Sequence, residues 1–269
     1  VIFLTIYKGV RIIARKNIFD LTGRVAVVTG ASSGLGVQMA KALAAQGADI
    51  AILARRKEKL EKVAEEIRTL GVKCLPIQCD VTDTEAVRKA AELIEADFGK
   101  VDILINNAGS GGVKPAIEMT DDDWAHTIDL DLTSVFTVSR EFGKIMIKNK
   151  YGRIINIASM YGLVGNSALP TSAYHAAKGG VVNLTRALAA EWAKYGITVN
   201  AICPGYFATE LTVDTLNTES FTSYMKATVP VGRYGNEGEL DTTAVYLSSD
   251  ASSYVTGAII PVDGGYTCV

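Results

Sequence analysis

Short apolar runs alternate with helical stretches along almost the whole chain, and this alternation is the strongest constraint on the fold. Strands joined through helices need crossover connections, which make a sheet mostly parallel and place helices on both of its faces. The sequence therefore predicts an α/β fold, a single doubly wound Rossmann-type domain with about seven strands. The expected strands are 24–29, 48–54, 72–78, 101–105, 152–157, 197–202 and 258–261, and the main helices between them are 34–43, 57–70, 83–98, 121–149 and 172–195.

The composition fits one globular domain and excludes several classes of partner. The chain has 269 residues, of which 48% are hydrophobic, and a formal net charge of -2. Because no basic surface or Lys/Arg run is present, we expect no nucleic-acid partner. The four cysteines lack Cys-x-x-Cys spacing, which favours reduced thiols in a cytoplasmic protein. Two histidines without a His/Cys cluster predict no metal site.

Two segments stand outside the regular alternation. Residues 1–16 are predicted to be an N-terminal extension in front of a domain at 17–269, because they are too short and too charged to span a bilayer and lack the features of a secretory signal. A partner-docking or membrane-surface segment is the alternative. After the sixth strand comes a long irregular insertion rich in Thr, Asn, Ser and Gly, and we expect a substrate lid near 206–235.

The stretch from Thr29 to Gly36 joins the first strand to the first helix through three glycines, in the order Gly-x-x-x-Gly-x-Gly. Such a turn presents bare backbone N–H groups and a helix N-terminus at one place, which suits a phosphate. The spacing differs from the Gly-x-Gly-x-x-Gly of many dinucleotide sites. The alternative is a tight strand-to-helix turn that binds no phosphate.

The end of the second strand carries Ala54, Arg55 and Arg56 at the place where an acid would bind an adenosine ribose. A guanidinium pair suits a 2′-phosphate instead, because Arg matches both the geometry and the charge of a phosphate. This pattern favours NADP over NAD. The alternative is that the two arginines are the solvated start of a charged helix and that NAD is the cofactor.

Small and polar residues follow the fourth and fifth strands, where open α/β sheets bind ligands. They are Asn106 to Gly109 and Ser159. Further along, Tyr174 and Lys178 lie four residues apart near the start of a helix, so both side chains project from one face. An adjacent ammonium stabilises the phenolate form of a tyrosine, which would make this pair a proton-transfer group. In isolation, a Tyr/Lys pair at helical spacing is more often a surface contact.

Taken together and in order, these elements resemble the short-chain dehydrogenase/reductase family. The resemblance covers residues 18–269, and the set is highly specific. It consists of the glycine turn, Asn106 to Gly109, Ser159, Tyr174-x-x-x-Lys178, Pro204-Gly205 and the terminal Asp263-Gly264-Gly265. Within the family, segments 17–23, 128–132, 157–160, 173–179 and 253–257 are most similar to members described as gluconate 5-dehydrogenases.

The family resemblance implies roles for the matching residues. Tyr174 would be the general acid/base at the substrate oxygen, Ser159 would hydrogen-bond that oxygen, and Lys178 would hold the nicotinamide ribose. Asp131 stands where many members have an Asn that completes a proton relay, so the relay is altered in this chain. The residues that would line the cofactor are Gly30, Ser32, Ser33, Gly34, Leu35, Gly36, Arg55, Arg56, Asp80, Val81, Asn107, Ala108, Gly109, Tyr174 and Lys178, with Pro204, Gly205, Phe207 and Thr209 at its nicotinamide end.

The resemblance also implies an activity. We expect an NADP(H)-dependent oxidoreductase that interconverts a secondary alcohol and a ketone by hydride transfer, and that forms a homotetramer or homodimer. A nucleotide-sensing binding protein without turnover is the alternative from another class. The intact Ser159, Tyr174 and Lys178 disfavour that alternative, because a sensor needs no proton path.

The substrate expected from the resemblance is a small polyol or sugar acid of the gluconate/5-ketogluconate type. Lys114 would bind the carboxylate of a sugar acid. The hydroxyls of the sugar acid would hydrogen-bond to Ser110, Tyr161, Asn166 and Tyr206. The same segments also carry apolar residues, so a hydroxysteroid or a 3-oxoacyl substrate stays open. These apolar residues are Met160, Leu163, Val164, Phe207, Leu211 and Phe221.

Overall fold

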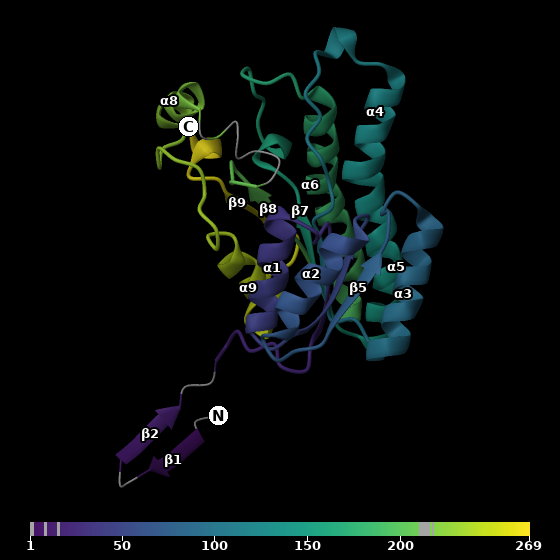
Figure 1. Cartoon of the computed structure of the whole chain (residues 1–269), viewed down its shortest axis with the longest axis vertical. Coiled ribbons are helices and arrows are strands. Elements are labelled where there is room, and N and C mark those ends of the chain that lie inside the picture. Colours follow the sequence, from purple (N-terminus) through teal and green to yellow (C-terminus); the bar gives the residue numbers. More distant parts are fainter. Residues whose placement is uncertain (1–2, 8–9, 15–16, 210–215, 217) are drawn as a thin grey trace.

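The computed structural model describes residues 3–7, 10–14, 17–209, 216 and 218–269. Its main feature is a seven-stranded sheet in the order β5-β4-β3-β6-β7-β8-β9, with every neighbouring pair parallel (Figure 1). The predicted doubly wound α/β domain is therefore confirmed. The strands are β3 (Val25–Thr29), β4 (Asp49–Ala54), β5 (Cys74–Gln78), β6 (Ile103–Asn106), β7 (Gly152–Ile157), β8 (Ile197–Pro204) and β9 (Ile259–Val262).

Helices cover both faces of the sheet (Figure 1). Along the interior strand β3, Ala26 and Val28 pack with α1, α2 and α9, whereas Val27 packs with α3, α5 and α6 on the other face. A buried parallel strand with apolar residues on both faces explains the continuous apolar runs in the sequence. The helices are α1 (Gly34–Ala45), α2 (Lys57–Arg68), α3 (Thr84–Phe98), α4 (Asp121–Ile128), α5 (Ser134–Asn149), α6 (Ser172–Trp192), α8 (Glu219–Thr228) and α9 (Asp241–Ser248).

The single helix expected over 121–149 is interrupted. A π-helical turn, Asp129–Thr133, separates α4 from α5, and Asp131 is fully buried within it. Such a turn inserts one residue into the helical repeat, which a hydrophobic pattern does not reveal, and π turns are frequent at functional sites. The helix α9 was not predicted either, because its Thr and Val residues have weak helix propensity.

The insertion after β8 is only partly irregular. Phe207 pairs with Gly235 in an isolated parallel bridge, and Glu219–Thr228 form the helix α8. In Figure 1, α8 lies beside the C-terminus of the chain, above the edge of the sheet. Leu211 lies outside the described residues.

Residues ahead of the domain pair with one another. Strand β1 (Phe3–Tyr7) is antiparallel to β2 (Val10–Ala14), and the two form a separate sheet that Figure 1 shows apart from the main one. We expected an extension here but assigned it no secondary structure. Its Ile, Val and Thr residues favour strands. In the part of the chain that the structure describes, no helix is long and apolar enough to cross a membrane.

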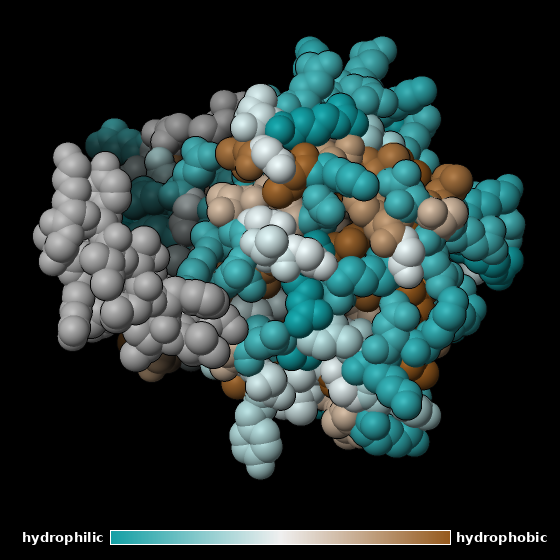
Figure 2. Space-filling view, turned by 90° about the horizontal axis from the view of Figure 1, so that it is seen from below, coloured by the Kyte–Doolittle hydropathy of each residue, from teal (hydrophilic) through white to brown (hydrophobic). Residues whose placement is uncertain are grey.

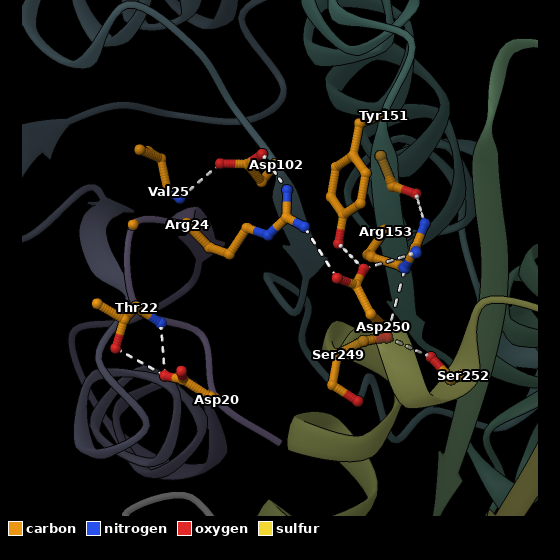
Figure 3. A network of polar contacts seen from close by, with 12 residues as sticks. Asp20, Thr22, Arg24, Val25, Asp102, Tyr151, Arg153, Ser249, Asp250 and Ser252 are labelled. Atoms are coloured by element: carbon orange, nitrogen blue, oxygen red, sulfur yellow. Dashed lines mark hydrogen bonds and ion pairs between the residues drawn. The ribbon is translucent and has the colours of Figure 1, made fainter. Parts of the chain in front are cut away.

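A polar network ties together the amino-terminal ends of the strands (Figure 3). Seen from below, this end of the molecule is mainly hydrophilic, with hydrophobic residues in small groups (Figure 2). The Tyr151 ring lies between the guanidinium groups of Arg24 and Arg153, whose Cζ atoms are 3.8 and 4.4 Å from its centroid. Asp250 accepts hydrogen bonds from all three residues, at 3.0 Å from Arg24, 3.2 Å from Arg153 and 2.9 Å from the Tyr151 hydroxyl. Burial raises the pKa of Tyr151 to about 12, so this hydroxyl stays protonated and donates.

We expect Asp250→Ala to lower the free energy of unfolding by about 1–3 kcal/mol near neutral pH, because the buried Arg153 loses its carboxylate partner. The pKa of Asp250 is lowered. Burial acts to raise it, but the Tyr151 hydrogen bond and the charges of Arg24 and Arg153 lower it more. The stabilisation is therefore full above the unfolded-state pKa of about 4, and is lost as the pH falls through the folded-state pKa.

Urea unfolding of wild type and variant between about pH 7 and pH 3 checks this expectation. The matched control is Asp97→Ala, which removes an exposed carboxylate from α3. A stability difference between Asp250→Ala and wild type that stays constant into acid would contradict the role given to Asp250.

Candidate active site

The glycine turn lies between β3 and α1, where the strand order of the sheet reverses and open α/β sheets bind nucleotides. Gly30 and Gly34 adopt left-handed backbone conformations, with φ of 67° and 59°. A Cβ atom at Gly36 would lie 2.6 Å from the Asn107 side-chain nitrogen and from the Gly30 carbonyl oxygen. Ser33 caps α1 without a side-chain hydrogen bond, which leaves the N–H groups of the first helical turn available to an anion.

The segment after β6 is tied directly to this turn. The Thr29 hydroxyl oxygen accepts hydrogen bonds from the backbone N–H groups of Asn107 and Ala108, each at 3.0 Å. The Asn107 side-chain amide donates back to the Thr29 carbonyl oxygen at 3.0 Å. At Gly109, a Cβ atom would collide with the Asp131 carboxylate, so glycine permits the close approach of that side chain. The structure therefore brings Asn107, Ala108 and Gly109 beside the glycine turn.

The end of β4 places a guanidinium over the same turn. Arg56 donates to the Ser32 hydroxyl at 3.0 Å and to the Ser33 hydroxyl at 2.7 Å. One guanidinium and two hydroxyls form a donor set that fits a phosphate group. Arg55 is exposed next to it.

Asp80 and the buried Val81 follow β5, the next strand along this edge of the sheet. The pKa of Asp80 is lowered. Burial acts to raise it, but hydrogen bonds from Thr82 and the positive charge of Arg55 lower it more. Asp80 is therefore a carboxylate near neutral pH and can accept further hydrogen bonds.

Tyr174 and Lys178 occupy the first two turns of α6. Tyr174 is half-buried, whereas Lys178 is only 3% exposed. The Lys178 ammonium lies 5.5 Å from the centroid of the Tyr174 ring, and it donates to the Ile157 carbonyl oxygen at 3.1 Å. The structure thus confirms that the two side chains lie on one face of α6. Lys178 is the buried member of the pair.

The partner of this buried cation is Asp131. Its Oδ1 atom lies 3.2 Å from the Lys178 ammonium, and it also accepts from the Ser110 backbone N–H at 3.2 Å. The pKa of Asp131 is raised. Burial raises it, and the charge and hydrogen bond of Lys178 oppose that shift only in part. Asp131 lies within the π-helical turn Asp129–Thr133, and this turn places its carboxylate against Lys178.

Ser159 follows β7 and is buried at the same edge of the sheet. Its hydroxyl oxygen accepts from the Tyr161 backbone N–H at 3.1 Å, which leaves its own proton available for donation. Gly205 follows β8, and its N–H donates to the Val262 carbonyl oxygen at 2.9 Å. Phe207 is buried, and Thr209 reaches the glycine turn, since its side chain would lie 3.3 Å from a Cβ atom placed at Gly34.

A tyrosine wall, made of Tyr161, Tyr206, Tyr224 and Tyr266, continues outward from Tyr174. The Tyr161 and Tyr174 rings meet edge to face at 6.5 Å, and the Tyr161 and Tyr206 hydroxyls hydrogen-bond at 2.6 Å. The Tyr224 and Tyr266 hydroxyls lie 3.2 Å apart. The wall thus joins segments after β7, β8 and β9 to helix α8.

Part of this wall was expected from the sequence, whereas Lys114 has a different partner from the one expected. Tyr161, Asn166 and Tyr206 do meet, since the Asn166 amide donates to the Tyr161 hydroxyl at 2.8 Å. Lys114, which we expected to meet a substrate carboxylate, is instead paired with Asp123, whose carboxylate also accepts from Thr120 in a capping box. The capping box Thr120-x-x-Asp123 was the available signal for that acid.

Two further wall residues, Tyr224 and Tyr266, were missed. Nothing in their local sequence marks them, because their partners are far away in the chain. A cavity of about 500 Å³ borders the wall at Tyr206, and its other lining residues include Phe207, Arg233, Thr242 and Asp263. None of Tyr174, Lys178 and Asp131 lines this cavity, so we assign the site to that cluster rather than to the cavity.

Comparisons with known proteins agree with this arrangement. A family model described as enoyl-(acyl carrier protein) reductase matches residues 30–267. The galactitol 2-dehydrogenase (L-tagatose-forming) of Cereibacter sphaeroides is 42% identical over 94% of this chain and 98% of its own length. The gluconate 5-dehydrogenase of Gluconobacter oxydans is 39% identical over 93% of this chain and 97% of its own length.

A solved structure of a dehydrogenase is similar to this chain as well. The gluconate 5-dehydrogenase from Burkholderia cenocepacia J2315, crystallised in complex with NADP and tartrate, superposes with a TM-score of 0.90 at 37% identity. The match covers 94% of this chain and 98% of that chain. The fold, the family model and the similar dehydrogenases agree with the resemblance found in the sequence, and this chain is an oxidoreductase that belongs to the short-chain dehydrogenase/reductase family.

Proposed function

We propose that the protein is an NADP(H)-dependent oxidoreductase that interconverts a secondary alcohol and a ketone on a polyol or sugar acid. The names of the similar proteins support the substrate class, since one acts on galactitol and others on gluconate. The Arg56, Ser32 and Ser33 donor set supports NADP, as does the NADP found in the similar crystal structure. We also propose that residues 17–269 are the catalytic domain, with a lid near 206–235 and an extension at 1–16.

When bound, the nicotinamide cofactor supplies or accepts the hydride. The protein then has to hold the substrate oxygen and move its proton. In the reducing direction, the Ser159 hydroxyl donates a hydrogen bond to the carbonyl oxygen, and the Tyr174 hydroxyl gives that oxygen its proton. In the oxidising direction, Tyr174 takes the proton back. Lys178 stabilises the negative charge left on Tyr174, and Asp131 holds Lys178 in place.

The observation that carries the proposal is the buried Lys178–Asp131 ion pair beside the half-buried Tyr174. Burying two charges is costly, so a pair that only packs the core would be better replaced by apolar residues. The test mixes the protein with NADPH and a panel of ketones that includes ketoses, 5-ketogluconate, a 3-ketosteroid and a 3-oxoacyl thioester. We expect NADPH absorbance to fall with a ketose or with 5-ketogluconate. No loss with any ketone would favour a binding protein without turnover.

The preference for NADP can be tested at Arg56. We expect Arg56→Ala to raise the KM for NADPH roughly 10-fold to 100-fold, because a charge-assisted hydrogen bond to a phosphate contributes about 1.5–3 kcal/mol. The KM for NADH should stay close to that of the wild type, since NADH lacks the 2′-phosphate. Steady-state kinetics with both cofactors measure this, and Lys57→Ala, a change of the neighbouring exposed base, is the matched control. An equal rise in KM for NADPH and for NADH would show that Arg56 does not bind the 2′-phosphate.

A further inference from the structure

We infer that the site takes an uncharged polyol and its ketose rather than a sugar acid. This inference rests on the proposed function and narrows its substrate class. It follows from the charges around the tyrosine wall and from the groups that the wall presents.

The cations near the wall are already engaged or point away from it. Residues 107–120, 158–178, 205–239 and 262–269, which follow β6, β7, β8 and β9, contain four Lys and Arg residues: Lys114, Lys178, Lys226 and Arg233. Lys178 is paired with the buried Asp131 at 3.2 Å, and Lys114 is paired with Asp123. The hydrogen bonds from Lys114 and Thr120 lower the pKa of Asp123, so that pair remains ionised near neutral pH.

The other two cations offer no better partner for a carboxylate. Arg233 holds Glu239 through two parallel hydrogen bonds of 2.7 Å, and this contact lowers the pKa of Glu239 to about 2. Lys226 is exposed on α8. It lies two residues beyond Tyr224, and residues two apart project from different sides of a helix. A carboxylate placed against the wall would therefore lose water without gaining a cation, which is unfavourable.

The histidine beside the wall is already engaged by the backbone. His175 stacks on the Tyr161 ring with the two centroids 4.6 Å apart. Its Nδ1 atom lies 2.8 Å from the Thr171 carbonyl oxygen, which can only accept, so Nδ1 carries the proton. Its Nε2 atom is buried and has no hydrogen-bond partner among the described residues.

The wall itself presents uncharged groups that both donate and accept hydrogen bonds. The Asn166 side-chain oxygen accepts from the Ala168 N–H at 2.8 Å, which orients the amide so that it donates to the Tyr161 hydroxyl. Burial raises the pKa values of Tyr161 and Tyr206, so both hydroxyls are protonated near neutral pH. Each hydroxyl has one donor and two acceptor positions, and the hydroxyls of a polyol complement such groups. The charge pairing and the hydroxyl wall therefore select the same substrate class.

The test compares kcat/KM for neutral ketoses (fructose, sorbose and tagatose) with that for 5-ketogluconate, using the intact protein and NADPH. We expect the best ketose to exceed 5-ketogluconate by about 10-fold or more. A higher value for 5-ketogluconate would overturn this inference and leave the proposed function standing. Turnover of only the 3-ketosteroid or the 3-oxoacyl thioester would overturn the proposed function and this inference with it.

Two variants test the wall directly. Tyr206→Phe keeps the ring and removes the hydroxyl, so we expect the KM for the ketose to rise about 10-fold while kcat stays near that of the wild type. Tyr195→Phe makes the same chemical change at an exposed tyrosine and is the matched control. Asn166→Lys places a cation on the wall and should raise kcat/KM for 5-ketogluconate about 10-fold. An unchanged KM in Tyr206→Phe together with no gain in Asn166→Lys would overturn the inference.

Discussion

Tyr174→Phe is expected to lower kcat about 10³-fold while NADPH still binds, because proton transfer by a positioned side chain contributes about 10²-fold to 10⁴-fold to a rate. Only the hydroxyl is removed. The ring keeps its edge-to-face contact with Tyr161 and its position 5.5 Å from the Lys178 ammonium. Single-turnover kinetics with a ketone and NADPH measure the chemical step, and NADPH fluorescence measures binding.

The control for this variant is Tyr161→Phe, which removes a neighbouring hydroxyl from the tyrosine wall. It should affect KM more than kcat, because Tyr161 contacts the proposed substrate pocket and transfers no proton. If Tyr174→Phe retained more than about a tenth of the wild-type kcat, the proton donor would have to be another group.

Asp131→Ala should have the second large effect, on both stability and turnover. Removing the carboxylate leaves the buried Lys178 ammonium without its ion-pair partner, and breaking a buried pair in this way costs about 3–5 kcal/mol. Lys178 would then be less well held beside Tyr174. We expect a lower free energy of unfolding and a kcat reduced by about 10²-fold, measured by urea unfolding and steady-state kinetics.

Asp131→Asn is the matched variant that separates charge from geometry. The Asn side chain keeps an oxygen that can accept from Lys178 and from the Ser110 N–H, so the positions of both groups are preserved. We expect Asp131→Asn to keep a kcat within about 10-fold of the wild type. Equal activity of Asp131→Ala and wild type would show that Asp131 has no part in the mechanism.

Much of this architecture could be predicted from the sequence because its determinants are local. The glycine turn, the Asn107 segment and the Tyr174–Lys178 spacing each follow from neighbouring residues whose backbone or helical geometry is known in advance. The strand order then brings them together at one edge of the sheet. The candidate catalytic residues could therefore be proposed from the sequence.

Other features could not be predicted because they depend on distant contacts or on one inserted residue. The π-helical turn around Asp131 leaves the apolar pattern of 121–149 nearly unchanged. The Tyr224–Tyr266 contact joins residues 42 positions apart, and no local pattern specifies it. The Lys114–Asp123 pair was not predicted because the two residues lie in different elements. Lys114 is in a loop, and Asp123 is in the first turn of α4.

The most direct test of the central claim, hydride transfer to a ketone, follows the hydride itself. The protein is incubated with NADPH deuterated at the transferred position and with the best ketose of the panel, and the alcohol product is analysed by mass spectrometry. We predict that each product molecule carries one deuterium on the carbinol carbon, and that Tyr174→Phe forms the same labelled product far more slowly. Consumption of NADPH without deuterium in the product, or no product from any ketone of the panel, would contradict the assignment of this site.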